Sequence, residues 1–281
     1  MSLQTLLCVT VLLYKLTGCL SIMGGRDAQR GVWPWMVHLE LRDTRNSSIA
    51  YCGGSMVSVQ WVLSSSSCFS GRSGPALPER SFACVGELSL LEPSGRKVKL
   101  KRVVLHPDYR DDGDIVYNDI ALVQLQEAVS FSDTVQPVLL PSPRDQFSPH
   151  AECWLTGWGH LEEFTPLGGK KTLQEVQVSL IDEATCRQKY PDKPDSMMCA
   201  GDLRGGKDSC TGDAGAPLVC VLAGEVERRF VQVGIVSFGD GCGRVGIPAF
   251  YTHVFHHTQF IRDTIQEAEC NNLPPSEACF L

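Results

Sequence analysis

Short apolar runs alternate with turn residues through much of the chain. Residues 51–57 and 61–63 look like two paired strands, and residues 81–85 form another β-like run. Runs of this length, bounded by turns, are typical of antiparallel β-barrels. The 26 glycines and 16 prolines fit a chain with many turns, and no low-complexity run indicates disorder. The pattern therefore predicts an all-β fold.

The first apolar run, residues 6–14, serves a different purpose. It has the length of a signal-peptide core and is too short to cross a bilayer, although Lys15 interrupts it and no charged side chain precedes it. No later stretch is long and apolar enough for a membrane span or a C-terminal anchor signal. We therefore expect residues 1–21 to be a signal peptide and the protein to be secreted and extracellular, without a membrane span.

Length and charge narrow the range of partners. With 281 residues, 43% of them hydrophobic, the chain can bury a core as one large domain or two small ones. The net charge is −7, and removal of residues 1–21, whose only formal charge is Lys15, changes it to −8. This mildly acidic surface has no basic stripe, which argues against a nucleic-acid partner.

The 13 cysteines, in a chain with a signal peptide, indicate disulfide bonds rather than metal ligation. No Cys-x-x-Cys pair is present, and the helical spacing of His253 and His257 lacks the glutamate of the H-E-x-x-H zinc motif. We expect no metal and no cofactor. The sequon at Asn46 is a candidate glycosylation site.

One loop carries a specific motif. Residues 207–220, KDSCTGDAGAPLVC, resemble the active-site loop of trypsin-like serine proteases, whose pattern is D-S-C-x-G-D-S-G-G-P-L-V-C. Ala214 stands where that pattern has the nucleophilic serine, and an alanine methyl cannot attack a carbonyl. Ala216 replaces the second glycine, which could shift the loop if that position needs a glycine conformation.

The other two members of the catalytic triad can be placed by the same resemblance. Residues 61–68, WVLSSSSC, align without a gap to W-V-L-T-A-A-H-C, so Ser67 stands where the family has the catalytic histidine. The N-D-I-A-L motif of residues 118–122 places the acid at Asp119. None of the seven histidines lies beside Cys68 in sequence, and a general base must be within hydrogen-bond reach of its nucleophile. We expect Asp119 to be a structural remnant, hydrogen-bonded by hydroxyls such as Ser67 and by backbone N–H groups.

The start of the mature family domain is also recognisable. Residues 22–25, IMGG, and 33–39, WPWMVHL, resemble I-V-G-G and W-P-W-Q-V-S-L. In that family the new ammonium of the isoleucine, here Ile22, pairs with the aspartate before the nucleophile, here Asp213. Ser21 precedes Ile22, so a trypsin-like activator has no basic residue to recognise. Signal peptidase could expose Ile22 directly, and cleavage after Gly18 or Cys19 is the competing outcome.

The resemblance extends from residue 22 to about 265 and is greatest to the tryptase- and prostasin-like branch. It implies two six-stranded antiparallel β-barrels, over residues 22–140 and 141–254, and a C-terminal helix over 255–267, so that the domain spans 22–267 and a tail spans 268–281. It also implies four disulfide bonds: Cys52–Cys68, Cys153–Cys220, Cys186–Cys199 and Cys210–Cys242. Of the remaining cysteines, Cys270 and Cys279 could pair locally. Cys84 would be a buried free thiol or a link to a partner chain.

The resemblance also implies a substrate pocket. The backbone N–H groups of Gly212 and Ala214 would form an oxyanion hole, which side-chain identity does not delete. Asp208 matches the carboxylate that selects Arg or Lys at the floor of the S1 pocket, whose walls would include Ser237 and Gly239. Ala249 replaces a glycine and should narrow this pocket. The pocket could capture a basic side chain without cleaving it, or Asp208 could be an inherited carboxylate that contacts only water.

Taken together, the residues favour a catalytically inactive protease homologue that acts by binding a protein partner, a substrate or a protease inhibitor. Loss of both the base and the nucleophile removes the reaction itself. The alternative is an active trypsin-like endopeptidase, cleaving after Arg or Lys, with a rearranged site in which a displaced histidine serves a serine such as Ser67.

Overall fold

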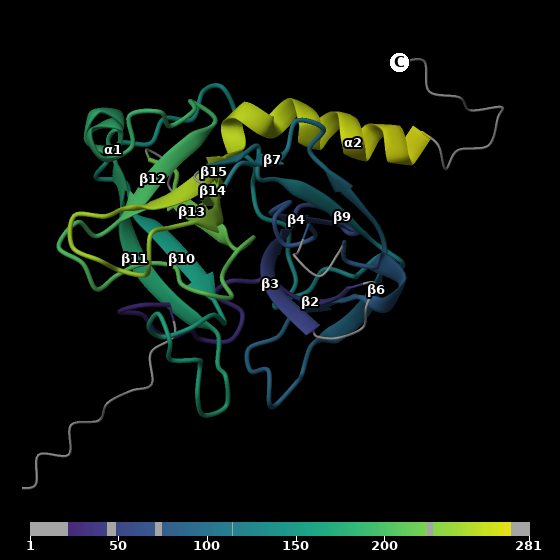
Figure 1. Ribbon diagram of the computed structural model, residues 1–281. Coiled ribbons are helices and arrows are strands. Elements are labelled where there is room, and N and C mark those ends of the chain that lie inside the picture. The colour runs from purple at the N-terminus through teal and green to yellow at the C-terminus, as the bar shows by residue number, and fades with distance from the viewer. Residues whose placement is uncertain (1–21, 44–48, 71–74, 114, 224–226, 271–281) are drawn as a thin grey trace, which may run out of the picture.

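A computed structural model describes residues 22–43, 49–70, 75–113, 115–223 and 227–270. The expected signal peptide, Asn46 and Cys279 lie outside these residues. Two β-barrels lie side by side, and a helix runs along the upper edge of the view (Figure 1). The two predicted six-stranded antiparallel barrels and the C-terminal helix are confirmed.

The first barrel is closed and contains six antiparallel strands, in the order β2-β3-β4-β9-β6-β5. The inward side chains of alternate strand positions, such as Val37, Leu39 and Leu41 of β2, pack into one buried cluster. The strands are β2 (Met36–Arg42), β3 (Ile49–Met56), β4 (Trp61–Ser64), β5 (Phe82–Val85), β6 (Arg96–Leu105) and β9 (Ala121–Leu125).

The second barrel has the strand order β11-β10-β13-β14-β15-β12 and is closed by pairing of β11 with β12. The short strand β1 adds to the outer side of β11. Its strands are β1 (Arg26–Asp27), β10 (Cys153–Gly157), β11 (Gln174–Ile181), β12 (Met197–Gly201), β13 (Pro217–Val221), β14 (Phe230–Phe238) and β15 (Ala249–His253).

Helix α2 (Thr258–Cys270) follows a 3-10 turn, η2 (Val254–His257), and starts and ends about three residues later than the predicted range. Its buried residues Ile261 and Ala268 lie on one face of the helix and pack with Trp61 and Leu122 of the first barrel. The chain therefore crosses from the second barrel back to the first at its C-terminal end. The smaller elements are η1 (Pro78–Arg80), β7 (Arg110–Asp111), β8 (Val116–Tyr117) and α1 (Glu183–Lys189).

The structure forms the four disulfide bonds that the resemblance implied. Each is expected to contribute about 2–4 kcal/mol by constraining the unfolded chain. Cys270 is also disulfide-bonded, and Cys84 is a buried free thiol. Within the described residues, no helix is long and apolar enough to cross a membrane.

Candidate active site

Asp119 is the centre of a buried hydrogen-bond network between the two barrels. It lies two residues before β9, is 1% exposed, and accepts three hydrogen bonds from two serines. The backbone N–H of Ser67 donates to Oδ1 at 2.7 Å, and its hydroxyl donates to Oδ2 at 2.9 Å. The Ser237 hydroxyl, near the end of β14, donates to Oδ2 at 2.6 Å.

Burial raises the pKa of Asp119, and the hydrogen bonds from Ser237 and Ser67 oppose this rise only in part. The contact between Ser67 and Asp119 is the one expected from the sequence. The contribution of Ser237 was not anticipated, because sequence reasoning assigned this residue only to the wall of the S1 pocket. Its position at the end of a strand in the other barrel gives no local signal.

Ala214 lies in the loop between β12 and β13 and faces the first barrel. It packs, together with Cys68, against that barrel's core cluster, and its carbonyl accepts a hydrogen bond from Gly53 N at 2.8 Å. The backbone N–H groups of Gly212 and Ala214 donate no hydrogen bond to any described residue. Both residues line one pocket of about 360 Å³, so these two donors are available to a ligand.

Ala216 does not disturb this loop. Its φ is not in the left-handed region, so the position needs no glycine conformation. Its methyl group instead occupies space opposite Gly53, where an added Cβ would lie 2.6 Å from the Cβ of Ala216. Gly53 of the first barrel is therefore the position that must be a glycine, because any Cβ there would clash with Ala216.

A pocket of about 360 Å³ lies next to Ala214, and three of the four residues expected in the S1 pocket are on its wall. Ser237, Gly239 and Ala249 line it, whereas Asp208 is not on its wall. Asp208 is 4% exposed, and its two carboxylate oxygens accept hydrogen bonds from Ser209 N at 2.8 Å and Gly243 N at 2.9 Å. Burial raises its pKa to about 6. The carboxylate is thus held behind the pocket.

Asp213 and Ile22 lie near each other and are both buried in the second barrel. Asp213 is 1% exposed and accepts hydrogen bonds from Gly159 N at 2.9 Å and Cys210 N at 3.0 Å. A Cβ on Gly157 would clash with the Asp213 carboxylate and would lie 3.4 Å from Ile22 Cδ1. Burial raises the pKa of Asp213 to about 7.

The histidines lie at other places in the molecule. His257 Nε2 is 3.2 Å from Asn118 Oδ1, and its ring packs edge-on against His106 at 5.3 Å. His160 is linked to the active-site loop through its backbone N–H, which donates to Thr211 O at 2.7 Å. Among the described residues, no histidine ring nitrogen hydrogen-bonds a serine, threonine or cysteine side chain.

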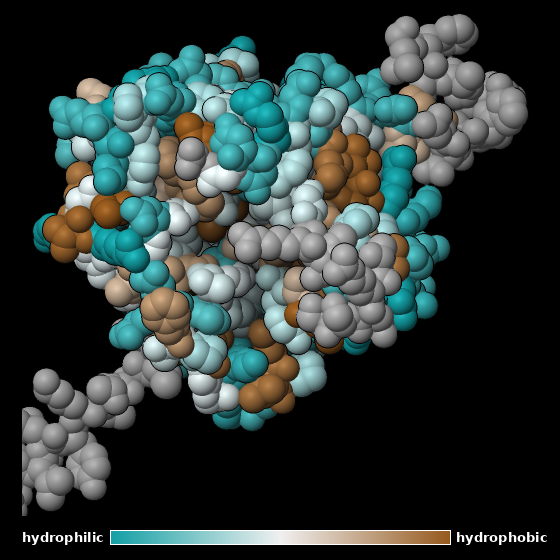
Figure 2. Space-filling model, in the orientation of Figure 1, coloured by the Kyte–Doolittle hydropathy of each residue, from teal (hydrophilic) through white to brown (hydrophobic). Residues whose placement is uncertain are grey.

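The surface in Figure 2 is hollowed near the middle, where the two barrels meet, and its apolar residues form separate patches over both barrels. No single broad apolar face is visible from this side. The network around Asp119 and the loop of Ala214 are built from both barrels, so the site depends on their packing together.

Comparison with known proteins agrees with this architecture. The trypsin family matches residues 22–261. Human testisin is 35% identical over 267 residues, an alignment that covers 91% of this chain and 81% of testisin. The chain therefore belongs to the trypsin family of serine proteases.

Proposed function

We propose that this protein is a secreted, catalytically inactive member of the trypsin family that acts by binding a protein partner, a substrate or a protease inhibitor. The observation that carries the proposal is the hydrogen bonding of Ser67 to Asp119. In this proposal Ser67 occupies the position of the general base and Ala214 that of the nucleophile. Serine has no group that accepts a proton at neutral pH in the way imidazole does.

The expected loss of turnover is large. In serine proteases the triad acts as a unit, and losing the serine or the histidine costs about 10⁶-fold in turnover. The acceleration that remains from an oxyanion hole and from binding is about 10³–10⁴ over water. A protein with that residual rate would not act as a protease.

The binding role rests on what the site retains. The N–H groups of Gly212 and Ala214 stay available beside the pocket of about 360 Å³, and such donors can hold a carbonyl oxygen without cleaving the bond. Secretion is supported by the expected signal peptide and by the disulfide bonds, which form and persist in oxidising compartments.

The alternative, an active endopeptidase with a displaced histidine, receives less support. His160 is the histidine hydrogen-bonded to the active-site loop, yet its partner there is a backbone carbonyl. Ser67, the serine that this alternative would use as its nucleophile, directs its hydroxyl to Asp119 and to Ser65 rather than to an imidazole.

The test is amide hydrolysis of Arg- and Lys-containing peptides by the purified secreted protein. We expect turnover no greater than that of the Asp208→Ala variant, and turnover clearly above this control would overturn the proposal. The double variant Ser67→His, Ala214→Ser is the matched positive control. If the scaffold is otherwise competent, it should cleave these peptides, whereas each single variant should not.

A further inference from the structure

A group of three side chains with metal-binding atoms lies on the outer face of the first barrel, away from the network around Asp119. His38 and Glu40 are two residues apart on β2, so both point outward while Val37 and Leu39 point into the barrel core. Cys84 lies on the neighbouring strand β5, directly opposite His38 in the strand register. The fold therefore brings imidazole, carboxylate and thiol together.

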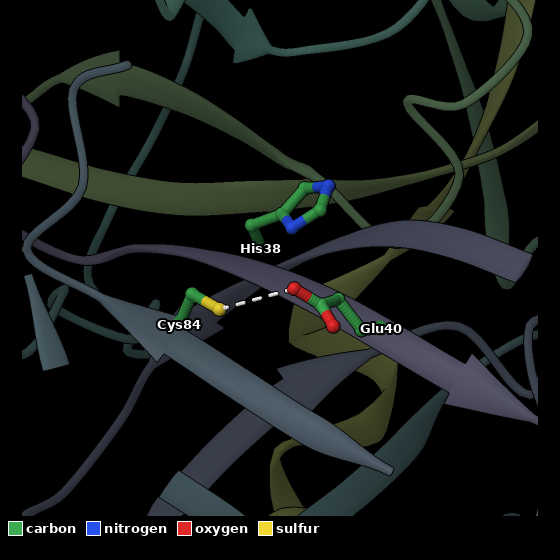
Figure 3. A group of neighbouring side chains, drawn as sticks. All are labelled: His38, Glu40 and Cys84. Atoms are coloured by element: carbon green, nitrogen blue, oxygen red, sulfur yellow. Dashed lines mark hydrogen bonds between the residues drawn. The ribbon is translucent and has the colours of Figure 1, made fainter. Parts of the chain in front are cut away.

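The ligand atoms of these residues are close together. The His38 nitrogen, a Glu40 carboxylate oxygen and Cys84 Sγ all lie within 4.8 Å of one another, and Cys84 Sγ is 3.7 Å from Glu40 Oε1. Figure 3 shows the edge of the imidazole that carries Nδ1 turned toward the Glu40 carboxylate and the Cys84 sulfur. The side chains converge on one point between the strands.

The His38 imidazole has an unused nitrogen at this point. His38 is 7% exposed, and its buried Nδ1 has no hydrogen-bond partner among the described residues. An unpartnered buried polar atom costs free energy, which a ligand at this position would recover. The ring is held in place by stacking on Tyr51, at 5.3 Å, and by edge contact with Trp158, at 5.5 Å.

Glu40 is oriented by a neighbour on one oxygen, while its other oxygen accepts a hydrogen bond from the Cys84 thiol, which the ion would replace. Oε2 pairs with Lys97 Nζ at 2.5 Å, whereas Oε1 faces the thiol. Such an outer contact is the kind that fixes the direction of a metal-binding carboxylate. All three side chains line a cavity of about 820 Å³, which gives an ion and a further ligand a route to the site.

We propose that His38 Nδ1, Glu40 Oε1 and Cys84 Sγ bind a Zn²⁺ ion, with the fourth tetrahedral position open to the cavity. Mixed nitrogen, oxygen and sulfur ligands suit Zn²⁺, and three protein ligands with one open position are a common zinc arrangement. The proposal does not depend on whether the protein is a protease.

The protonation states are consistent with this chemistry. Burial lowers the pKa of His38 to about 4, so the imidazole is neutral and can donate its lone pair. Burial raises the pKa of the Cys84 thiol to about 12, so formation of the Zn–S bond must release the thiol proton to solvent.

The experiment uses Co²⁺ as a spectroscopic probe and Zn²⁺ in competition with it, on the full secreted protein stripped of metal by a chelator. We expect one Co²⁺ per chain with a thiolate-to-cobalt charge-transfer band, which Zn²⁺ abolishes. Cys84→Ser should remove the band, and His38→Ser and Glu40→Gln should each weaken Zn²⁺ binding by at least about tenfold. His256→Gln, an exposed histidine outside the group, is the matched control and should change nothing.

Three results would overturn the proposal: no charge-transfer band in the wild type, a band that survives in Cys84→Ser, or binding that is lost in His256→Gln. Near-ultraviolet circular dichroism of each variant without metal establishes that it is folded. The wild-type band is informative by itself, because a thiolate must coordinate cobalt to produce it, so the result does not depend on any variant folding.

Discussion

Ser67 contacts Asp119 through two different groups, its backbone N–H to Oδ1 at 2.7 Å and its hydroxyl to Oδ2 at 2.9 Å. Ser237, from the other barrel, donates to the same Oδ2 at 2.6 Å. A buried carboxyl group is costly unless its oxygens accept hydrogen bonds, so the two serines stabilise the same acid. This shared dependence can be measured.

The losses in the free energy of unfolding caused by removing the two hydroxyls should be non-additive. Ser67→Ala and Ser237→Ala should each lower the free energy of unfolding by about 1 kcal/mol, because one hydroxyl remains in either variant. The double variant leaves Asp119 with the Ser67 N–H, so its loss should exceed the sum of the single losses. Urea unfolding measures all three. Ser148→Ala, an exposed control hydroxyl, should change stability by less than about 0.5 kcal/mol, and strictly additive losses would contradict a shared role.

Much of the fold could be predicted because its signals are local in sequence. The apolar run of residues 61–63 and the cysteines at 52 and 68 fix one stretch of the chain in register, and the structure joins these cysteines as implied. The same register places Ser67 opposite Asp119. Each of these motifs fixes the positions of its residues along the chain, so the contact between Ser67 and Asp119 could be predicted from the sequence.

Contacts that depend on strand pairing or loop depth could not be predicted. Ser237 reaches Asp119 across 118 residues of sequence, and His38 meets Cys84 only because β2 pairs with β5. The expectation that no metal binds rested on the disulfide use of the cysteines and on local motif spacing, neither of which shows that two strands bring His38 and Cys84 together. Asp208 has the expected motif, yet its depth behind the pocket wall depends on the backbone of Gly243.

The pocket beside Ala214 should be sensitive to the methyl group of Ala249, which lines it while Asp208 lies behind its wall. Ala249→Gly should enlarge the pocket and bring a benzamidine cation closer to this carboxylate, since a cation gains most from a desolvated acid. We expect benzamidine to bind at least about tenfold more tightly than to the wild type, a difference of about 1.4 kcal/mol. Calorimetric titration measures this, and the gain should vanish when Asp208→Ala is added. An unchanged affinity would show that Ala249 does not restrict the pocket.

Gly215 should be required by the loop that holds Ala214. Its φ is +82°, and an added Cβ would lie 2.5 Å from Gly53 O and clash with Ser64 Oγ. Gly215→Ala should therefore lower the free energy of unfolding by about 3 kcal/mol or more, combining the backbone cost and overpacking. Gly169→Ala is the matched control, because that glycine also has a positive φ, +55°, with no atom near its added Cβ. Only the backbone cost of about 1–2 kcal/mol should appear there, and equal losses in denaturant unfolding would contradict the steric argument.

Cleavage of the chain before Ile22 should change both the backbone strain at Ile22 and the pKa of Asp213. With the preceding residue attached, Ile22 has a φ of +48°, which is costly for a β-branched residue. Asp213 then has a pKa raised to about 7, and its hydrogen bonds come from backbone N–H groups. Cleavage would remove the carbonyl that makes this φ unfavourable and would place an ammonium group close to Asp213. An ammonium group beside Asp213 would lower its pKa.

The direction in which stability changes with pH therefore distinguishes a chain that continues before Ile22 from one that begins at Ile22. In a chain that continues before Ile22, folded Asp213 binds its proton more tightly than the unfolded chain does, so its contribution to stability is lost as pH rises toward about 7. Relative to Asp213→Asn, the free energy of unfolding of the wild type should fall by on the order of 1 kcal/mol per pH unit between the ordinary pKa of an aspartate and about pH 7. In a chain that begins at Ile22, the ionised carboxylate should instead make the wild type the more stable protein at pH 7. N-terminal sequencing of the secreted protein, with denaturant unfolding of both proteins from pH 5 to 8, tests this, and a wild type that gains stability with pH while retaining residues before Ile22 would contradict it.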